Sequence, residues 1–166
     1  TYIRPLVEYC SVVWSPCLKK YIDVLEKVQR KFSKRIPCLS ALPYKERLAR
    51  LNLLPLELRR LHFDLTFYYK LFTNRSSLDI DKFFTFHTPP ASSRNPMPFI
   101  QKPQSATNLL LSSFRYRSID SWNSLPLHVK NSSSLSSFKK ALHNIDFTSF
   151  LYGSSFTALS DFKIVF

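Results

Sequence analysis

The sequence predicts a mostly α fold: an N-terminal helical bundle, a proline-rich crossing, and a smaller α-rich or mixed C-terminal part. Up to Phe72, apolar residues recur at steps of three and four, as one face of an amphipathic helix requires. Five prolines then fall between 88 and 104, where they exclude regular helix. We therefore expect four segments, namely a helical subdomain over 1–72, a linker over 73–108, a small helical unit over 109–147 and a poorly ordered tail over 148–166.

Composition limits the classes of function open to the chain. Its 166 residues suffice for one domain, or for one compact unit with a tail. The 24 Lys and Arg against 11 Asp and Glu give a formal net charge of +13, which favours a phosphate-rich partner such as nucleic acid. Hydrophobic residues make up 45% of the chain, too many for a disordered basic tail. The single glycine excludes the Walker loop and the dinucleotide fingerprint, which need several.

The start of the sequence, its apolar stretches and its cysteines indicate the cellular location to expect. The chain starts at Thr1 with neither an initiator methionine nor a signal sequence, so we expect an excised fragment. No stretch approaches the roughly 18 apolar residues of a membrane span, so no membrane partner is expected. Cys10, Cys17 and Cys38 are odd in number and lack zinc-pair spacing. We expect reduced thiols and an intracellular location, nuclear and cytoplasmic.

The clearest predicted helix covers 19–36. Its apolar residues step by three, three, four and four and fall on one face, which we expect to be buried: Ile22, Leu25, Val28, Phe32 and Ile36. Asp23 and Glu26 stand four residues before Lys27 and Arg30, a spacing that supports a helix through ion pairs.

Basic residues of this helix gather roughly opposite its apolar face. They form one stripe, extended by Arg35 near the helix end: Lys20, Lys27, Lys31 and Lys34. A stripe of this kind can meet a phosphate backbone without burying any charge. It is equally typical of a solvated surface.

Two prolines are placed to open further helices, since proline fits the first helical turn. Pro43 precedes a short helix, and Pro55 precedes a longer one whose apolar stripe reaches Phe72. Arg59 and Arg60 lie beside that stripe, and Asp64 is spaced to pair with Arg60. The two arginines suit either a helix-locking ion pair or a phosphate contact.

The second half gives weaker patterns. Phenylalanines at 83, 84 and 86 indicate a short extended segment, and 109–119 fits strand or helix. Trp122 precedes a turn marked by Pro126, and a last helix is expected over 135–145 with Ser134 as its N-cap. We expect both Trp14 and Trp122 to be packing residues.

The sequence contains no recognisable catalytic set. Asp79 and Asp81 are its closest acidic pair, but they stand in a loop-like run beside no predicted strand, unlike a metal-binding polymerase pair. The four histidines, His62, His87, His128 and His143, lack metal-ligand spacing and stand beside no nucleophile. We assign no catalytic residue, no metal site and no cofactor to this chain.

Four blocks of the sequence carry a resemblance to a known family. They are Tyr2-Ile3-Arg4-Pro5-Leu6-Val7-Glu8-Tyr9-Cys10 with Val13-Trp14-Ser15-Pro16; Leu25-Glu26-Lys27-Val28-Gln29-Arg30 with Lys34-Arg35-Ile36; Tyr44-Lys45-Glu46-Arg47-Leu48 with Leu54-Pro55-Leu56-Glu57-Leu58-Arg59-Arg60 and Asp64-Leu65; and Arg117 with Trp122-Asn123-Ser124-Leu125-Pro126 and Phe138-Lys139. Together they resemble the C-terminal region, after the palm, of non-LTR (LINE-type) retrotransposon reverse transcriptases. The resemblance spans about residues 1–145.

The resemblance implies a parent RNA-directed DNA polymerase whose catalytic aspartates, and the Mg²⁺ they hold, lie outside this chain. The N-terminal bundle is then similar to a thumb, a helical unit that grips the RNA/DNA template–primer beside the palm. Some LINE proteins end in a Cys/His knuckle, which this sequence lacks.

We therefore expect a non-catalytic region that grips nucleic acid through phosphate contacts. The residues assigned to that role are Lys20, Lys27, Lys31, Lys34, Arg35, Arg59 and Arg60. Two alternatives stay open: a helical interaction module that packs on the palm or on a protein partner, and an inactive, decayed or domesticated copy.

Overall fold

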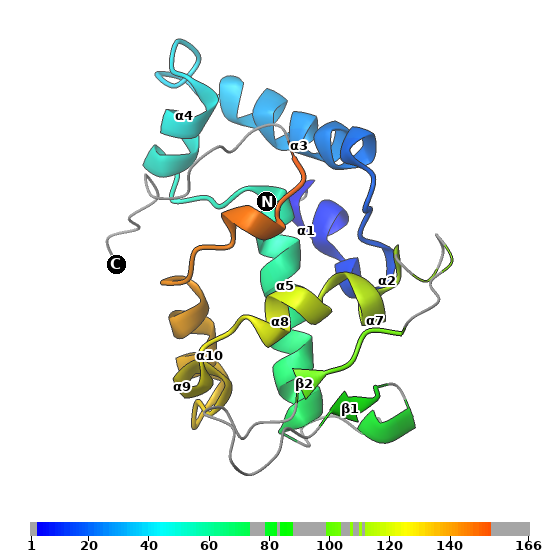
Figure 1. Cartoon of the computed structure of the whole chain (residues 1–166). Helices are drawn as coiled ribbons and strands as arrows, with labels where there is room; N and C mark the ends of the chain where they lie inside the picture. Colours follow the sequence, from blue (N-terminus) through cyan, green and yellow to red (C-terminus); the bar gives the residue numbers. More distant parts are fainter. Residues whose placement is uncertain are drawn as a thin grey trace. The chain divides into compact units, whose positions relative to one another are not determined.

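A computed structural model describes residues 3–73, 79–82, 84–87, 99–103, 107, 110 and 112–153, apart from the side chains of residues 3 and 4. The fold is mostly α, as predicted. In order, the elements are α1 (Ile3–Glu8), α2 (Ser11–Trp14), α3 (Lys19–Lys34), α4 (Tyr44–Arg50), α5 (Leu56–Phe72), a 3-10 turn (Ile80–Lys82), β1 (Phe86–His87), β2 (Phe99–Ile100), α7 (Phe114–Arg117), α8 (Ile119–Asn123), α9 (Leu127–Lys130), α10 (Leu135–Leu142) and a second 3-10 turn (Thr148–Phe150) (Figure 1).

The predicted helices form close to their expected positions. α3 begins at Lys19 as expected, and α4 and α5 each start one residue after the proline predicted to open them. The Ser134 side chain caps α10 by accepting a hydrogen bond from the Ser137 N–H, 3.1 Å away. The segment that fitted strand or helix is helical over Phe114–Arg117.

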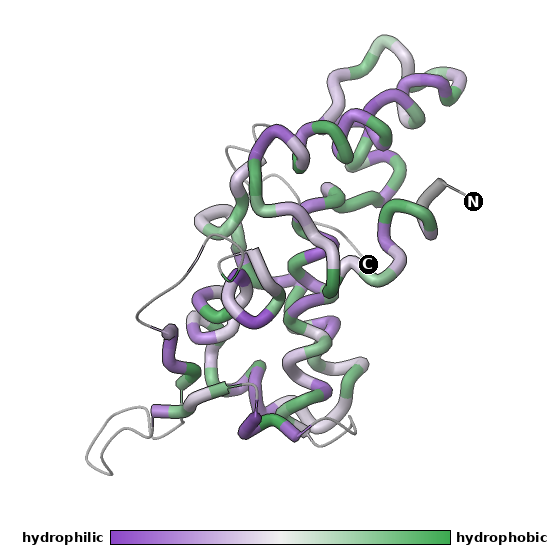
Figure 2. Tube along the Cα trace, turned by 90° about the vertical axis from the view of Figure 1, so that its right-hand side faces the viewer, coloured by the Kyte–Doolittle hydropathy of each residue, from purple (hydrophilic) through white to green (hydrophobic). Residues whose placement is uncertain are grey.

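By its contacts the chain divides into two compact units that differ from the predicted segments. Unit 1 comprises 1–11, 16–61 and 146–166, and unit 2 comprises 12–15 and 62–145. Hydrophilic and hydrophobic residues alternate along the helices of both units (Figure 2). Most of the proline-rich crossing and the part of the tail after residue 153 lie outside the described residues, so both expectations stay predictions.

Unit 2 has an aromatic core. Tyr68 and Tyr69 of α5 are both buried, and Tyr69 stacks on Phe138 of α10 at 4.4 Å between ring centroids. Trp122 of α8 stacks on Phe72 at 4.9 Å. The ring contacts therefore join α5, α8 and α10 into one core.

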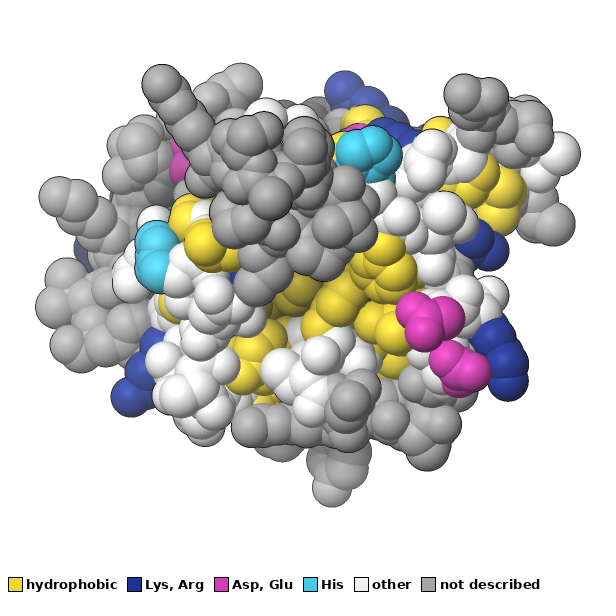
Figure 3. Space-filling view, turned by 60° about the horizontal axis from the view of Figure 1, so that its bottom comes forward, with side chains coloured by type: hydrophobic (Ala, Val, Ile, Leu, Met, Phe, Trp, Pro, Cys, Tyr) yellow, Lys and Arg dark blue, Asp and Glu magenta, His cyan; other side chains and the backbone are white. Residues whose placement is uncertain are grey.

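A two-stranded antiparallel sheet borders this core. β1 pairs with β2 in the register Phe86 to Ile100 and His87 to Phe99. The Asn123 side chain donates to the Ile100 carbonyl and accepts from its N–H, which ties the sheet to α8. Hydrophobic side chains gather on the face drawn in Figure 3.

Unit 1 contains polar contacts between residues far apart in the sequence. Glu57 accepts hydrogen bonds from the N–H groups of Tyr152 and Gly153, at 2.7 and 2.9 Å. A Cβ atom at Gly153 would lie 2.6 Å from Glu57 Oε2, so the carboxylate would have to move, and 3.5 Å from Ile22 Cγ2, an ordinary contact distance. The only glycine of the sequence therefore stands where backbone and carboxylate approach closely.

Candidate nucleic-acid interface

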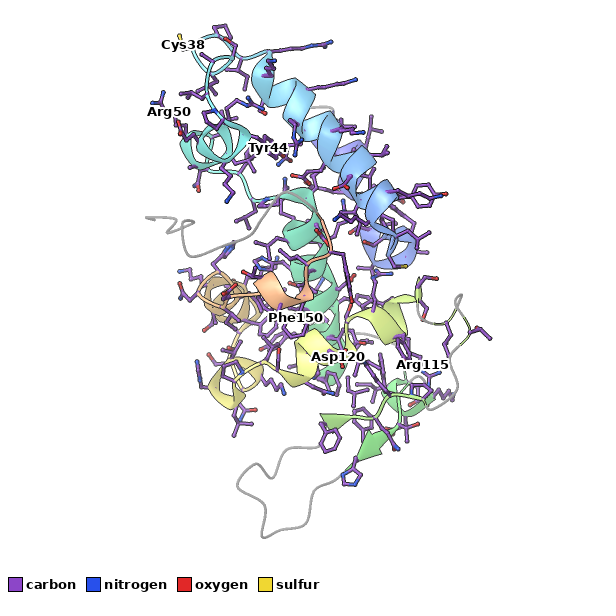
Figure 4. All side chains as sticks on the ribbon, turned by 45° about the horizontal axis from the view of Figure 1, so that its top comes forward. Cys38, Tyr44, Arg50, Arg115, Asp120 and Phe150 are labelled. Carbon is purple, nitrogen blue, oxygen red and sulfur yellow. The ribbon has the colours of Figure 1, made fainter. Side chains whose placement is uncertain are left out.

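Helix α3 carries most of the predicted interface, and α4 fixes one side of it. The Tyr44 hydroxyl donates to Glu26 Oε1 at 2.5 Å, and Arg47 Nε donates to Ser33 Oγ at 3.2 Å. Figure 4 shows Tyr44 lying between the two helices. Arg47 also donates to the Leu42 carbonyl at 2.7 Å, so the guanidinium is held from two sides.

The buried face of α3 is polar. Glu26 is buried, and besides Tyr44 it accepts the Leu56 N–H at 3.0 Å. Burial raises the pKa of Glu26, while these two hydrogen bonds oppose the rise. Gln29 donates to the Leu54 carbonyl at 3.1 Å. These directional contacts fix which side of α3 faces inward.

This arrangement corrects the predicted burial of α3. Of the five apolar residues expected inside, only Ile22 is fully buried, whereas Val28 and Phe32 are 37% and 45% exposed. The inward row, at steps of four, three and four, is instead Ile22, Glu26, Gln29 and Ser33. Apolar periodicity found Ile22 but missed the other three members of this row, because they are polar and meet hydrogen-bonding partners instead.

The basic stripe of α3 is exposed along its whole length. Every residue of the stripe is at the surface: Lys20, Lys27, Lys31, Lys34 and Arg35. Side chains ending in nitrogen extend from α3 on the side away from α4 (Figure 4). At about 1.5 Å rise per residue, successive lysines stand roughly 5–10 Å apart along the axis. The helix thus presents a one-sided row of positive charge to solvent.

Arg59 and Arg60 do not belong to that surface. Both are buried, and Arg59 Nη2 pairs with Glu8 Oε1 at 2.5 Å. The assignment of these two residues to phosphate contact does not fit their burial, because a nucleic acid cannot reach them without opening unit 1. Asp64, expected to pair with Arg60, accepts hydrogen bonds from Arg117 at 2.9 and 3.0 Å.

The other groups considered from the sequence include Asp79 and the histidines His62 and His143. Asp79 forms an exposed ion pair with Lys82 at 3.3 Å, and we assign it no metal-binding role. Within the described part of the chain, no group of three or more His, Cys, Asp or Glu could hold a metal ion. His62 and His143 make an edge-to-face contact at 5.2 Å. Burial, with a smaller contribution from His143, lowers the pKa of His62 to about 3.

The two tryptophans differ in how deeply they are buried. Trp122 is 5% exposed and lies in the core of unit 2, as predicted. The prediction for Trp14 is wrong, because this side chain is 40% exposed. Trp14 ends α2, a helix of four residues that is too short to bury a large ring by itself.

No family model, curated protein or solved structure matches this chain. Among the described residues, no helix is long and apolar enough to cross a membrane. The case for a function therefore depends on the residues themselves.

Proposed function

We propose that this chain is a non-catalytic, nucleic-acid-gripping region of a reverse transcriptase of the non-LTR retrotransposon type. In this proposal α3 contacts the sugar-phosphate backbone of a template–primer. The parent chain's palm supplies the polymerase chemistry and its Mg²⁺, and neither is derived from this chain's residues.

One observation carries the proposal: the exposed row of Lys20, Lys27, Lys31, Lys34 and Arg35 on a helix whose inward face is fixed by hydrogen bonds. A fixed helix presents its cations at constant spacing, so less ordering is needed on binding. Lysines act as point charges on phosphates, and we therefore expect little dependence on base sequence. The resemblance over residues 1–145 supports the same function.

The test uses charge-matched double variants of the whole chain. Lys27→Gln/Lys31→Gln removes two cations from the row, and Lys139→Gln/Lys140→Gln removes two exposed cations from α10. We expect only the first variant to weaken binding to a 20-base-pair duplex. Its slope of log affinity against log salt should fall by about one per lost contact.

The control variant excludes a general effect of net charge, and circular dichroism checks that both variants stay folded. Equal affinity and equal salt slope for the wild type and the α3 variant would contradict the proposal. The row would then be a solvated surface.

A second candidate is an interaction module that docks on the palm or on another protein. The observation that favours it is the exposure of Leu6 and Tyr9, in and just after α1, and of Leu18 before α3. Apolar docking of this kind weakens little as salt rises, whereas phosphate binding weakens steeply. The salt titration described above therefore separates the two candidates.

A further inference from the structure

A second exposed row runs along α3 beside the lysines. Its members are apolar and at least one-third exposed, with fractions of 51%, 55%, 37% and 45% for Tyr21, Val24, Val28 and Phe32. Their steps of three, four and four keep them on one face of the helix. An apolar row at the surface of a fixed helix indicates a binding partner.

The apolar row and the basic row belong to one surface. At about 100° per residue, the two rows lie about 100° apart around the helix, so one ligand can touch both. Lys20 Nζ lies 4.7 Å from the centroid of the Tyr21 ring, which places a cation directly against an aromatic face. A ligand suited to this surface therefore carries both negative charge and flat apolar groups.

Charge decides between the possible occupants. A second copy of the chain, which carries a net charge of +13, would bring like-charged rows together. A duplex satisfies the lysines but keeps its bases stacked inside, away from Tyr21 and Phe32. A single strand offers phosphates and accessible base faces together, which is how many single-strand-binding surfaces work.

We infer that α3 binds single-stranded nucleic acid more tightly than duplex, with unpaired bases stacked on Tyr21 and Phe32 while the lysine row holds the phosphates. The inference rests on the proposed function and adds the class of nucleic acid. The two rings stand 11 residues apart, about 16 Å along the axis. The nucleotides between them pass over Val24 and Val28.

The test measures anisotropy of two labelled probes, a 20-nucleotide oligo-dT and a 20-base-pair duplex, with the whole chain. We expect the wild type to prefer oligo-dT. Tyr21→Leu and Phe32→Leu should each weaken oligo-dT binding by between about 5-fold and about 150-fold, because each removes one stacked base. Duplex binding and its salt slope should stay unchanged, since no lysine is lost.

Two controls separate stacking from structural damage. Phe32→Trp restores a stacking ring and should restore oligo-dT affinity. Phe63→Leu removes a comparably exposed ring from α5, 38% exposed, and should change neither probe's binding. Thermal melting checks that the leucine variants remain folded, as expected for exposed positions.

The outcomes distinguish failure of the proposed function from failure of the inference alone. If Lys27→Gln/Lys31→Gln binds both probes as tightly as the wild type, the proposed function is overturned, and the inference falls with it. If the lysine variant loses affinity but Tyr21→Leu and Phe32→Leu bind oligo-dT as tightly as the wild type, the stacking is wrong and only the inference is overturned. The same holds if the wild type binds the duplex at least as tightly as oligo-dT. The wild type could also sediment as a dimer that the ring variants dissociate, with no change in oligo-dT affinity. That result would assign the apolar row to self-association and would also overturn the inference.

Discussion

Aromatic rings dominate the interior of unit 2, whereas unit 1 combines buried aliphatic side chains with a buried polar row on α3. Unit 2 packs rings against rings, with Tyr68, Tyr69 and Trp122 at its centre. In unit 1, α3 is joined to its neighbours through Glu26 and Ser33, both buried. Ring packing stabilises through area and depends little on direction, whereas buried polar contacts require each donor to meet its acceptor. Substitutions should therefore destabilise the two units by different mechanisms.

The largest expected effect is in the aromatic core. Trp122→Ala should lower the free energy of unfolding by about 3–5 kcal/mol, because it leaves a cavity among packed rings. Trp14→Ala, at the exposed tryptophan, should cost clearly less. Urea denaturation followed by circular dichroism measures both, and equal losses would contradict the difference in burial.

In unit 1 the expected effect is smaller and depends on chemistry rather than volume. Glu26→Ala leaves the Tyr44 hydroxyl and the Leu56 N–H without their acceptor and should cost about 3 kcal/mol. Glu26→Gln keeps an acceptor oxygen without a buried charge and should cost less. A loss as large for Gln as for Ala would show that the charge itself is needed, and urea denaturation decides between them.

The pH dependence of the two interiors should have opposite signs. His62 of unit 2 stays neutral in the fold, with its pKa at about 3, but takes up a proton near pH 6.5 when unfolded. Its contribution to stability is therefore present above pH 6.5 and is lost as pH falls towards 3, by at most about 1.4 kcal/mol per pH unit. Glu26, whose pKa is raised, contributes the reverse: stability falls as pH rises above its unfolded pKa near 4.5.

One variant at each of the two positions isolates the contributions of His62 and Glu26 to the pH dependence of stability. The difference in unfolding free energy between wild type and His62→Leu should shrink as pH falls from 6.5 to 4. The same difference for Glu26→Gln should change in the opposite direction between pH 4 and 7. Parallel curves for wild type and His62→Leu would contradict the lowered pKa.

The same contrast explains which expectations from sequence succeeded. Helix bounds in unit 1 followed from Pro43, Pro55 and apolar spacing, because these signals are local. The orientation of α3 did not, because Tyr44 and Leu56, which meet Glu26, lie 18 and 30 residues away in sequence. Apolar spacing therefore placed Ile22 correctly but wrongly put Val28 and Phe32 on the buried side.

The basic residues assigned to the candidate interface fall into an exposed group and a buried group. The lysine row could be found from spacing alone, since charged side chains on a helix stay at the surface unless partners bury them. Arg59 and Arg60 carry the same charge, but their burial depends on tertiary partners such as Glu8, 51 residues before Arg59 in the sequence. Trp122 followed the expectation for a large ring, whereas the short α2 left Trp14 exposed.

The hydrogen-bonded inner side of α3 has a consequence for variation in this chain. Glu26, Gln29 and Ser33 fix the rotation of the helix about its own axis, so that rotation does not depend on what the outer side carries. Outer positions can then change one at a time without turning the helix or shifting their neighbours. Such a helix is a frame on which affinity and selectivity can be altered separately, by exchanging cations in one row and rings in the other.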